Sequence, residues 1–285
     1  MKKFNHIVAG ILLSLLAFTA SSLRIKDEDG LRLIKSVSTL PVQKVSIDRY
    51  NFIYYADDRG NVYKYDQEGN LLLTFSPRKN SDVTLLEAWR NVNILVFYRN
   101  YQEFIFLNRF LTETPNFILD EEGQDQDKSV GFARLATFTG DNNLWIIDDD
   151  DFSLKKLDLT YNKLIIHTPL ELVLDKKTYD FNFMREYQNL LFVNDKNSGI
   201  LVFDNLGNYK SKLEFKGLNY FSFQGNSLYF IEDGHIRLYD IYTGEESKIK
   251  LPEGKQFQYA LLGDKRAYLF TDKSMEVYQC PACKQ

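Results

Sequence analysis

Four consecutive aspartates, Asp148 to Asp151, form the densest group of metal-binding side chains in the sequence. Calcium prefers carboxylate oxygens, but a calcium-binding loop supplies six or more oxygens from alternating positions and has a glycine at its sharp turn. The run 148–151 lacks this alternation, and no glycine follows at the required position. We therefore expect no metal ion at this cluster, and no cofactor in the protein.

The two cysteines, Cys280 and Cys283, form the sequence CPAC near the end of the chain. A redox Cys-x-x-Cys motif normally lies at a helix N-terminus, where the helix dipole lowers a thiol pKa, and this pair instead follows a strand-like run. A zinc site would need two further ligands, but His167 and His235 fall in different sequence repeats. The pattern favours a local disulfide, or two free thiols, over redox catalysis.

Motifs of hydrolytic enzymes are missing from the sequence. It contains no Gly-x-Ser-x-Gly elbow, no His-Glu-x-x-His pair and no phosphate-binding glycine-rich loop. Neither His167 nor His235 has an evident serine or cysteine partner. We therefore expect a protein that is not an enzyme.

The first residues have the pattern of a secretory signal peptide. A basic start, MKK, precedes the apolar core IVAGILLSLLAFTA, which is short for a membrane span. Ala20-x-Ser22 suits cleavage before Leu23, whereas cleavage after Ala20 would place the bulky Phe18 at the third position before the cut. No cysteine lies near either cut, which argues against a lipid anchor.

We expect residues 1–22 to be removed and residues 23–285 to be exported to the periplasm or secreted, with no membrane insertion after cleavage. An uncleaved membrane anchor is the alternative. Removal of Lys2 and Lys3 takes the formal net charge from −4 to −6. This mild acidity, without a clustered basic patch, argues against nucleic acid as a partner.

An apolar run that ends in a polar pair occurs six times, and successive copies lie 38 to 49 residues apart. This spacing marks an internal repeat. A second apolar run follows each copy after a short polar turn, as in two antiparallel strands. The paired runs are 53–58 with 62–66, 95–100 with 104–108, 144–149 with 154–158, 190–195 with 200–204, 228–233 with 236–240, and 267–272 with 275–279.

Strand-like runs flank each pair and complete a four-stranded antiparallel sheet. The preceding runs are 44–47, 83–89, 133–138, 179–184, 220–223 and 258–262, and the following runs are 71–75, 114–119, 163–168, 209–215 and 247–251. Inner runs such as LWII and LYFI are apolar throughout, so both faces of these strands must be buried, as in blades packed around a ring. A single β-sandwich, the alternative fold, predicts an alternation that these runs lack.

The last repeat has no fourth strand, whereas an unassigned strand-like run, 31–37, precedes the first repeat. We expect this run to pair with 275–279, because a closed ring leaves few free sheet edges. The sequence therefore predicts an all-β fold: a six-bladed β-propeller of four-stranded antiparallel blades, closed by an N-terminal strand that completes the last blade.

The hairpins DQEGNLLLTF (66–75) and DNLGNYKSKLEF (204–215) look like those of NHL-type repeats. Over residues 31–279 the chain resembles six-bladed β-propellers of the NHL or TolB-like type. The resemblance implies a binding platform, since most propellers of this class bind partners and a minority are enzymes. Calcium-dependent lactonases of similar shape use acidic and amide ligands around the central channel. Asp48 ends one first strand here, but its equivalents in the other repeats are mostly apolar or glycine.

Acidic residues recur in the loops between the second and third strand of each repeat, which open on one face of a propeller. This face is a candidate docking surface for a basic protein partner, or a loose Ca²⁺ site, but aspartate also ends strands and caps turns, and that alone explains most of these residues. The insertion 120–128 should lie on the same face. The candidate residues are Asp57, Asp58, Asp148, Asp149, Asp150, Asp195, Asp233 and Asp272.

The function predicted from the sequence is that of an exported, non-enzymatic protein-binding module. Its specific form would be an accessory or plug subunit of an outer-membrane secretion or uptake channel, with a large outer-membrane protein as partner. The alternative is a metal-dependent enzyme of the lactonase or hydrolase type, with its site at the central channel.

Overall fold

The computed structural model describes residues 30–89, 93–114, 117–118, 130–174 and 178–283. The expected signal peptide, residues 1–22, and the acidic insertion, residues 120–128, lie outside these ranges. From Leu31 onward the chain forms one compact unit.

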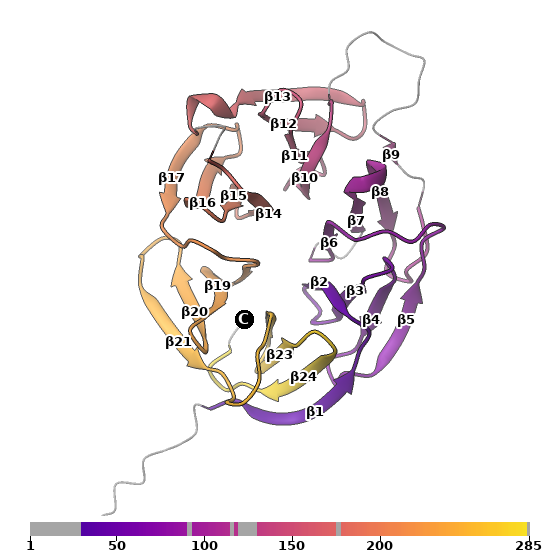
Figure 1. Ribbon diagram of the computed structural model, residues 1–285, viewed down its shortest axis with the longest axis vertical. Coiled ribbons are helices and arrows are strands. Elements are labelled where there is room, and N and C mark those ends of the chain that lie inside the picture. The colour runs from indigo at the N-terminus through magenta and orange to yellow at the C-terminus, as the bar shows by residue number, and fades with distance from the viewer. Residues whose placement is uncertain (1–29, 90–92, 115–116, 119–129, 175–177, 284–285) are drawn as a thin grey trace, which may run out of the picture. The chain divides into compact units, whose positions relative to one another are not determined.

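Six antiparallel sheets of four strands each are arranged around a central axis (Figure 1), as the repeats predict. Blade one contains β2 (Val42–Ile47), β3 (Ile53–Asp57), β4 (Val62–Tyr65) and β5 (Leu71–Phe75). Blade two contains β6 (Leu85–Glu87), β7 (Ile94–Tyr98), β8 (Glu103–Leu107) and β9 (Phe117–Ile118). Blade three contains β10 (Ala133–Phe138), β11 (Leu144–Asp148), β12 (Ser153–Asp158) and β13 (Lys163–Pro169).

The remaining blades follow the same order from the centre to the rim. Blade four contains β14 (Phe181–Tyr187), β15 (Leu190–Asp195), β16 (Gly199–Asp204) and β17 (Tyr209–Leu213). Blade five contains β18 (Ser222–Gln224), β19 (Ser227–Glu232), β20 (His235–Asp240) and β21 (Glu246–Lys250). Blade six contains β22 (Tyr259–Gly263), β23 (Arg266–Phe270), β24 (Ser274–Gln279) and, on its outer edge, β1 (Arg32–Ser38).

The pairing of β1 with β24 closes the ring, which confirms the predicted closure. The strands are antiparallel, and the register runs from Arg32 opposite Gln279 to Ser38 opposite Ser274. Figure 1 shows the indigo N-terminal strand lying along the yellow C-terminal strand. Chain segments more than two hundred residues apart therefore share one sheet, and no blade has to be completed by another molecule.

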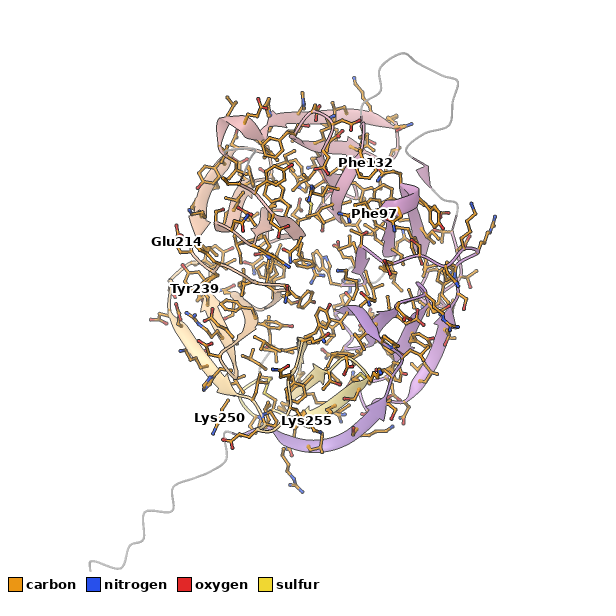
Figure 2. The ribbon with its side chains drawn as sticks, in the orientation of Figure 1. Phe97, Phe132, Glu214, Tyr239, Lys250 and Lys255 are labelled. Carbon is orange, nitrogen blue, oxygen red and sulfur yellow. A yellow bond between two sulfur atoms is a disulfide. The ribbon has the colours of Figure 1, made fainter. Side chains whose placement is uncertain are left out.

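Burial follows the position of a strand within its blade. The second strands β3, β7 and β11 are buried at every residue. The rim strand β13 instead alternates between exposed and half-buried residues. Side chains fill the space between neighbouring sheets (Figure 2), so each blade stabilises the next through apolar contact on both of its faces.

The hairpin turns that recur along the sequence belong to the fold. In the turn after β16, the carboxylate of Asp204 accepts the backbone N–H groups of Leu206 and Asn208, each at 2.9 Å. Gly207 in the same turn has φ of +80°, and a Cβ atom there would lie 2.9 Å from Thr168 of the preceding blade. The repeated Asp and Gly-Asn residues therefore shape turns that pack against a neighbouring blade.

Some strands differ in length from the expected runs: β6 covers Leu85–Glu87 within the predicted 83–89. β9 covers Phe117–Ile118 within the predicted 114–119, of which 115–116 and 119 lie outside the described residues. Short 3₁₀ turns are formed by Arg99–Tyr101 and Leu170–Leu172. No helix in the described part of the chain combines the length and apolar character needed to cross a bilayer.

Removing β1 tests the closure of the ring. A chain that begins at Leu40 should lose several kcal/mol of unfolding free energy, because six register pairs disappear and each backbone hydrogen bond contributes roughly 1 kcal/mol net. It should also aggregate through the exposed edge of β24. The measurements are chemical denaturation and light scattering, with a chain that begins at Gly30 as the control. Equal stability and solubility of the two chains would show that β1 does not close the ring.

Candidate functional site

The loops that follow the second strand of each blade lie on one face of the ring, which we call the aspartate face. The turns that follow the first strands lie on the opposite face. Three of the eight candidate aspartates are buried: Asp57 and Asp148 have no exposed surface, and Asp195 is 1% exposed. Asp57 accepts the backbone N–H groups of Arg59 and Asn61, each at 2.9 Å. These buried carboxylates shape their own loops and lie below the surface.

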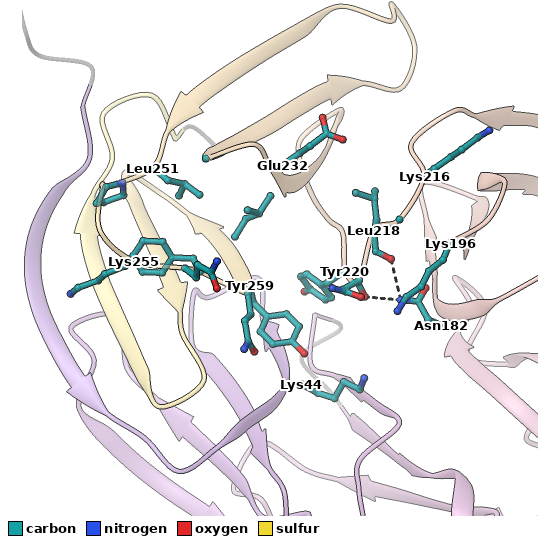
Figure 3. A pocket seen from close by; sticks show the side chains of 18 residues that line it. Lys44, Asn182, Lys196, Lys216, Leu218, Tyr220, Glu232, Leu251, Lys255 and Tyr259 are labelled. Carbon is teal, nitrogen blue, oxygen red and sulfur yellow. Dashed lines mark hydrogen bonds between the residues drawn. The ribbon is translucent and has the colours of Figure 1, made fainter.

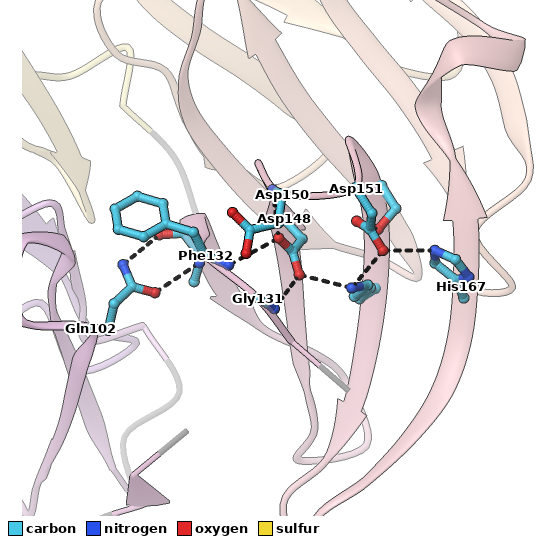
Figure 4. Close-up of polar contacts among 10 residues, drawn as sticks. Gln102, Gly131, Phe132, Asp148, Asp150, Asp151 and His167 are labelled. Carbon is cyan, nitrogen blue, oxygen red and sulfur yellow. Dashed lines mark hydrogen bonds and ion pairs between the residues drawn. The ribbon is translucent and has the colours of Figure 1, made fainter. Parts of the chain in front are cut away.

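Asp148 also holds the chain where it enters blade three. Its two carboxylate oxygens accept the backbone N–H groups of Gly131 at 2.7 Å and Phe132 at 3.0 Å (Figure 4). Gln102, in the loop before β8, bonds the backbone of Ala133 through both its amide nitrogen and its amide oxygen. Blades two and three are thus joined by side chains that bond the backbone at the start of β10.

A lysine lies between the carboxylates of the aspartate run. Lys155 Nζ is 2.8 Å from Asp148 Oδ2 and 2.7 Å from Asp151 Oδ2, and Asp151 is in turn 3.2 Å from His167 Nε2. The ammonium group therefore neutralises carboxylates that a metal ion would otherwise bind. No cluster of three or more metal-binding His, Cys, Asp or Glu side chains exists among the described residues.

The contact between Lys155 and Asp151 shifts the pKa of both side chains. Burial alone would lower the pKa of Lys155, but its hydrogen bonds to Asp148 and Asp151 outweigh burial and raise the pKa. Burial would raise the pKa of Asp151, and the bonds from Lys155 and Ser153 lower it instead. Because the folded pKa of Asp151 lies below the ordinary value, its contribution to stability is present at neutral pH and is lost as the pH falls.

The other five candidate aspartates reach the surface. Asp149 forms an ion pair of 2.6 Å with Arg134. The remaining four are exposed, and they are Asp58, Asp150, Asp233 and Asp272. The structure therefore divides the predicted set into three buried loop-shaping residues, one ion-paired residue and four exposed residues.

A cavity of about 770 Å³ opens at the centre of the aspartate face, between blades four, five, six and one (Figure 3). Its charged lining is mainly basic. The lysines that line it are Lys44, Lys196, Lys216 and Lys255, and the one acidic residue in its lining is Glu232. Tyr220 and Tyr259 form part of the wall, with ring centroids 5.4 Å apart.

Lys44 of β2 and Lys196 of the loop after β15 reach the cavity from different blades (Figure 3). Burial lowers the pKa of Lys44, and the positive charges of Lys196 and Arg99 lower it further, while Asp82 opposes the change. Neither ammonium group has an ion-pair or hydrogen-bond partner within the described ranges. Two half-buried positive charges thus face one cavity, and neither forms an ion pair within the described ranges.

The other two lysines have partners. Lys255 pairs with the buried Glu276 of β24, and Lys216 lies 3.9 Å from Glu214. The loop that carries Leu218 is fixed by side-chain amides of blade four: Asn182 donates to its backbone oxygen at 3.2 Å, and Asn194 does so at 2.6 Å. The cavity wall is therefore preformed by contacts within the ring.

Sequence reasoning missed this basic cavity. Its lysines come from four separate segments, so no motif or charge run marks them. The one signal was Lys196, which lies in the loop NDKNSG directly after Asp195.

Cys280 and Cys283 do not line the cavity. Their sulfur atoms are joined in a disulfide, and both residues are buried. The backbone N–H of Cys280 donates to the carbonyl of Lys265, and that of Lys265 donates to the carbonyl of Cys283. These two backbone hydrogen bonds hold the disulfide-closed segment after β24 against the turn between β22 and β23.

Replacing Lys155 tests the buried ion pairs. Lys155→Met should lower the unfolding free energy at pH 7 by roughly 3 kcal/mol, because Asp148 remains buried without its cation. The difference from the wild type should shrink in acid, as Asp151 becomes protonated. Chemical denaturation across a pH series measures both effects.

Lys163→Met, at an exposed position of β13, is the matched control and should change the unfolding free energy by at most about 0.5 kcal/mol. Equal effects of the two substitutions would rule out a structural role for the Lys155 ion pairs.

No family model matches the sequence, and no curated protein matches it. Solved structures resemble the fold. The Pan2 WD40 domain of Neurospora crassa has a TM-score of 0.62 at 8% identity, over 91% of this chain and 99% of that one. A chain of the Mitotic Checkpoint Complex has a TM-score of 0.62 at 9% identity, over 91% and 95%. Virginiamycin B lyase from Staphylococcus aureus has a TM-score of 0.58 at 8% identity, over 87% and 99%. At such identities the likeness shows the β-propeller fold alone.

Proposed function

We propose that this protein is an exported, non-enzymatic β-propeller that binds a protein partner through its aspartate face. An acidic segment of the partner enters the lysine-lined cavity at the centre of that face. The observation that carries the proposal is the pair Lys44 and Lys196, two half-buried ammonium groups that face one cavity without a carboxylate partner in the described chain. A carboxylate placed between them would remove their mutual repulsion and offset the cost of their burial.

The surroundings of the cavity favour a protein as the occupant. Loops from several blades form the cavity, and the exposed Asp58, Asp150, Asp233 and Asp272 belong to the same face. A partner with an acidic segment flanked by basic residues would complement both the basic cavity and the exposed aspartates around it. Such complementarity fixes the register of a complex and speeds its formation. A propeller chain within the Mitotic Checkpoint Complex shows that the fold occurs in multiprotein assemblies.

Export is supported by two independent features. Residues 1–22 have the basic start, apolar core and small residues of a signal peptide. The disulfide between Cys280 and Cys283 is of a kind that persists in oxidising compartments. We propose the periplasm, or secretion, as the location, and an accessory or plug subunit of an outer-membrane secretion or uptake channel as the specific role.

Charge reversal tests the docking face. Cross-linking in extracts of the source cells should recover one protein with the wild type, and Lys196→Glu should reduce its recovery at least about tenfold because an acidic side chain then faces the partner's carboxylate. The substitution should not destabilise the free protein, since the new glutamate lies near Lys44. Quantitative mass spectrometry of the cross-linked material is the measurement.

Lys248→Glu on the rim strand β21 has the same change in net charge and should recover the partner at the wild-type level. Equal recovery by all three proteins would contradict docking at the cavity. A tightly held stoichiometric metal ion in the purified protein would instead favour a metal-dependent enzyme.

Processing tests export. When the full chain is expressed in a double-membraned bacterium, the protein should be found in the periplasm or medium, with Leu23 as its first residue. Its intact mass should be two hydrogens below that of the fully reduced chain, because Cys280 and Cys283 are oxidised. Mass spectrometry of the fractionated cells reads both values. A chain that retains Met1 in the cytoplasm with free thiols would refute export.

A further inference from the structure

A second cavity, of about 300 Å³, lies on the opposite face, at the ends of the innermost strands. We propose that it binds a small monocarboxylate with an apolar body, held by the guanidinium group of Arg185. This inference concerns the other end of the central channel and does not depend on the proposed protein partner.

Arg185 of β14 is 3% exposed and lines this cavity. Its Nη1 atom donates to Ser222 Oγ at 3.2 Å, while Nε and Nη2 have no hydrogen-bond partner. The Nε–H and Nη2–H groups form the edge of a guanidinium that binds a carboxylate with two parallel hydrogen bonds. The side chain is therefore anchored at one end, and its carboxylate-binding edge is buried and left without a hydrogen-bond partner.

The acids near this channel are already engaged. Glu87 is 1% exposed and accepts hydrogen bonds from Trp89 Nε1 at 2.6 Å and Thr137 Oγ1 at 2.7 Å. Asp48 accepts two backbone N–H groups and the hydroxyl of Tyr54. Burial raises the pKa of both carboxyl groups, and at Glu87 the positive charge of Arg185 partly opposes that rise. Neither acid forms an ion pair with Arg185 in the described ranges. A buried guanidinium without a paired anion is costly, and a bound carboxylate would remove that cost.

The remaining wall sets the character of the ligand body. Tyr187 and Phe223 are stacked, with ring centroids 4.3 Å apart, and Trp89 lies 6.1 Å from Tyr187. Ile47 and Leu262 add aliphatic surface. An apolar wall disfavours a strongly hydrated anion such as phosphate and favours an aromatic or aliphatic acid. The volume lies at the lower limit for ligand pockets, which indicates a small molecule.

Tryptophan fluorescence can report on this cavity directly. The chain has two tryptophans: Trp145 is fully buried within blade three, and Trp89 lines the cavity. Titration with phenylacetate should change the emission saturably, and phenylacetamide, which has the same shape but no charge, should bind at least about tenfold more weakly. Equal binding of the two compounds, or no saturable change up to about 10 mM, would overturn the proposal.

Substitutions separate Arg185 from general electrostatics. Arg185→Met should abolish the preference for the acid over the amide, and Arg185→Lys should reduce it, because lysine keeps the charge but loses the paired hydrogen bonds. Arg78→Met, at an exposed position outside the lining of this cavity, should retain the preference. An Arg185→Met variant that still prefers the acid over the amide would refute the role of Arg185.

A stability measurement distinguishes binding from a purely structural role. Arg185→Met should melt no earlier than the wild type without ligand, since it removes a buried charge that has no ion-pair partner. Phenylacetate should raise the melting temperature of the wild type and leave that of Arg185→Met unchanged. A variant that melts earlier, together with an unaltered preference in Arg185→Lys, would assign Arg185 to the fold and reject the site.

The carboxylate could belong to a free acid or to the end of a peptide. Titration of N-acetyl-alanyl-phenylalanine and its C-terminal amide distinguishes these sources. Preference for phenylacetate over the dipeptide supports the small acid that we propose. If the dipeptide binds more tightly than both its amide and phenylacetate, the carboxylate contact is supported but the assignment to a small molecule is overturned.

Discussion

Antiparallel pairing between β1 and β24 is the contact on which the rest of the structure depends. It joins the first described strand to the last and turns six stacked sheets into a closed ring. Both central cavities exist because the ring closes. One lies between blades four, five, six and one, and the other is lined from blades one, two, four, five and six. Blade one can line either cavity beside blade six only because closure brings the start and end of the chain together.

Polar side chains within this ring follow a simple rule, since a buried charge must be paired or hydrogen-bonded to be tolerated. Asp57, Asp148 and Asp195 obey it by accepting hydrogen bonds from backbone N–H groups. Lys44 and Arg185 satisfy it least within the described chain, because neither forms an ion pair and Arg185 makes a single hydrogen bond, to Ser222. Three of the eight acids that look functional in the sequence are thus structural, and the cations that carry the two proposals stand out only in three dimensions.

The fold could be predicted from the sequence because each blade has a recognisable local sequence pattern. Continuous apolar runs such as Leu144 to Ile147 require burial on both faces, and a missing last strand beside an unassigned first strand implies closure. Burial of individual aspartates was not readable, because Asp57 and Asp58 are neighbours of the same type with opposite environments. The cavities could not be predicted from the sequence either, because Lys44 of blade one and Lys196 of blade four face the same cavity only in the folded ring.

Native-state hydrogen exchange of β1 tests the closed ring most directly. The account predicts that amide groups between Arg32 and Ser38 that bond to β24 exchange slowly, and at the same rate as the paired amides of β24, because both strands open only when blade six unfolds. Rapid exchange throughout β1, while β23 and β24 remain protected, would contradict it and leave the ring open.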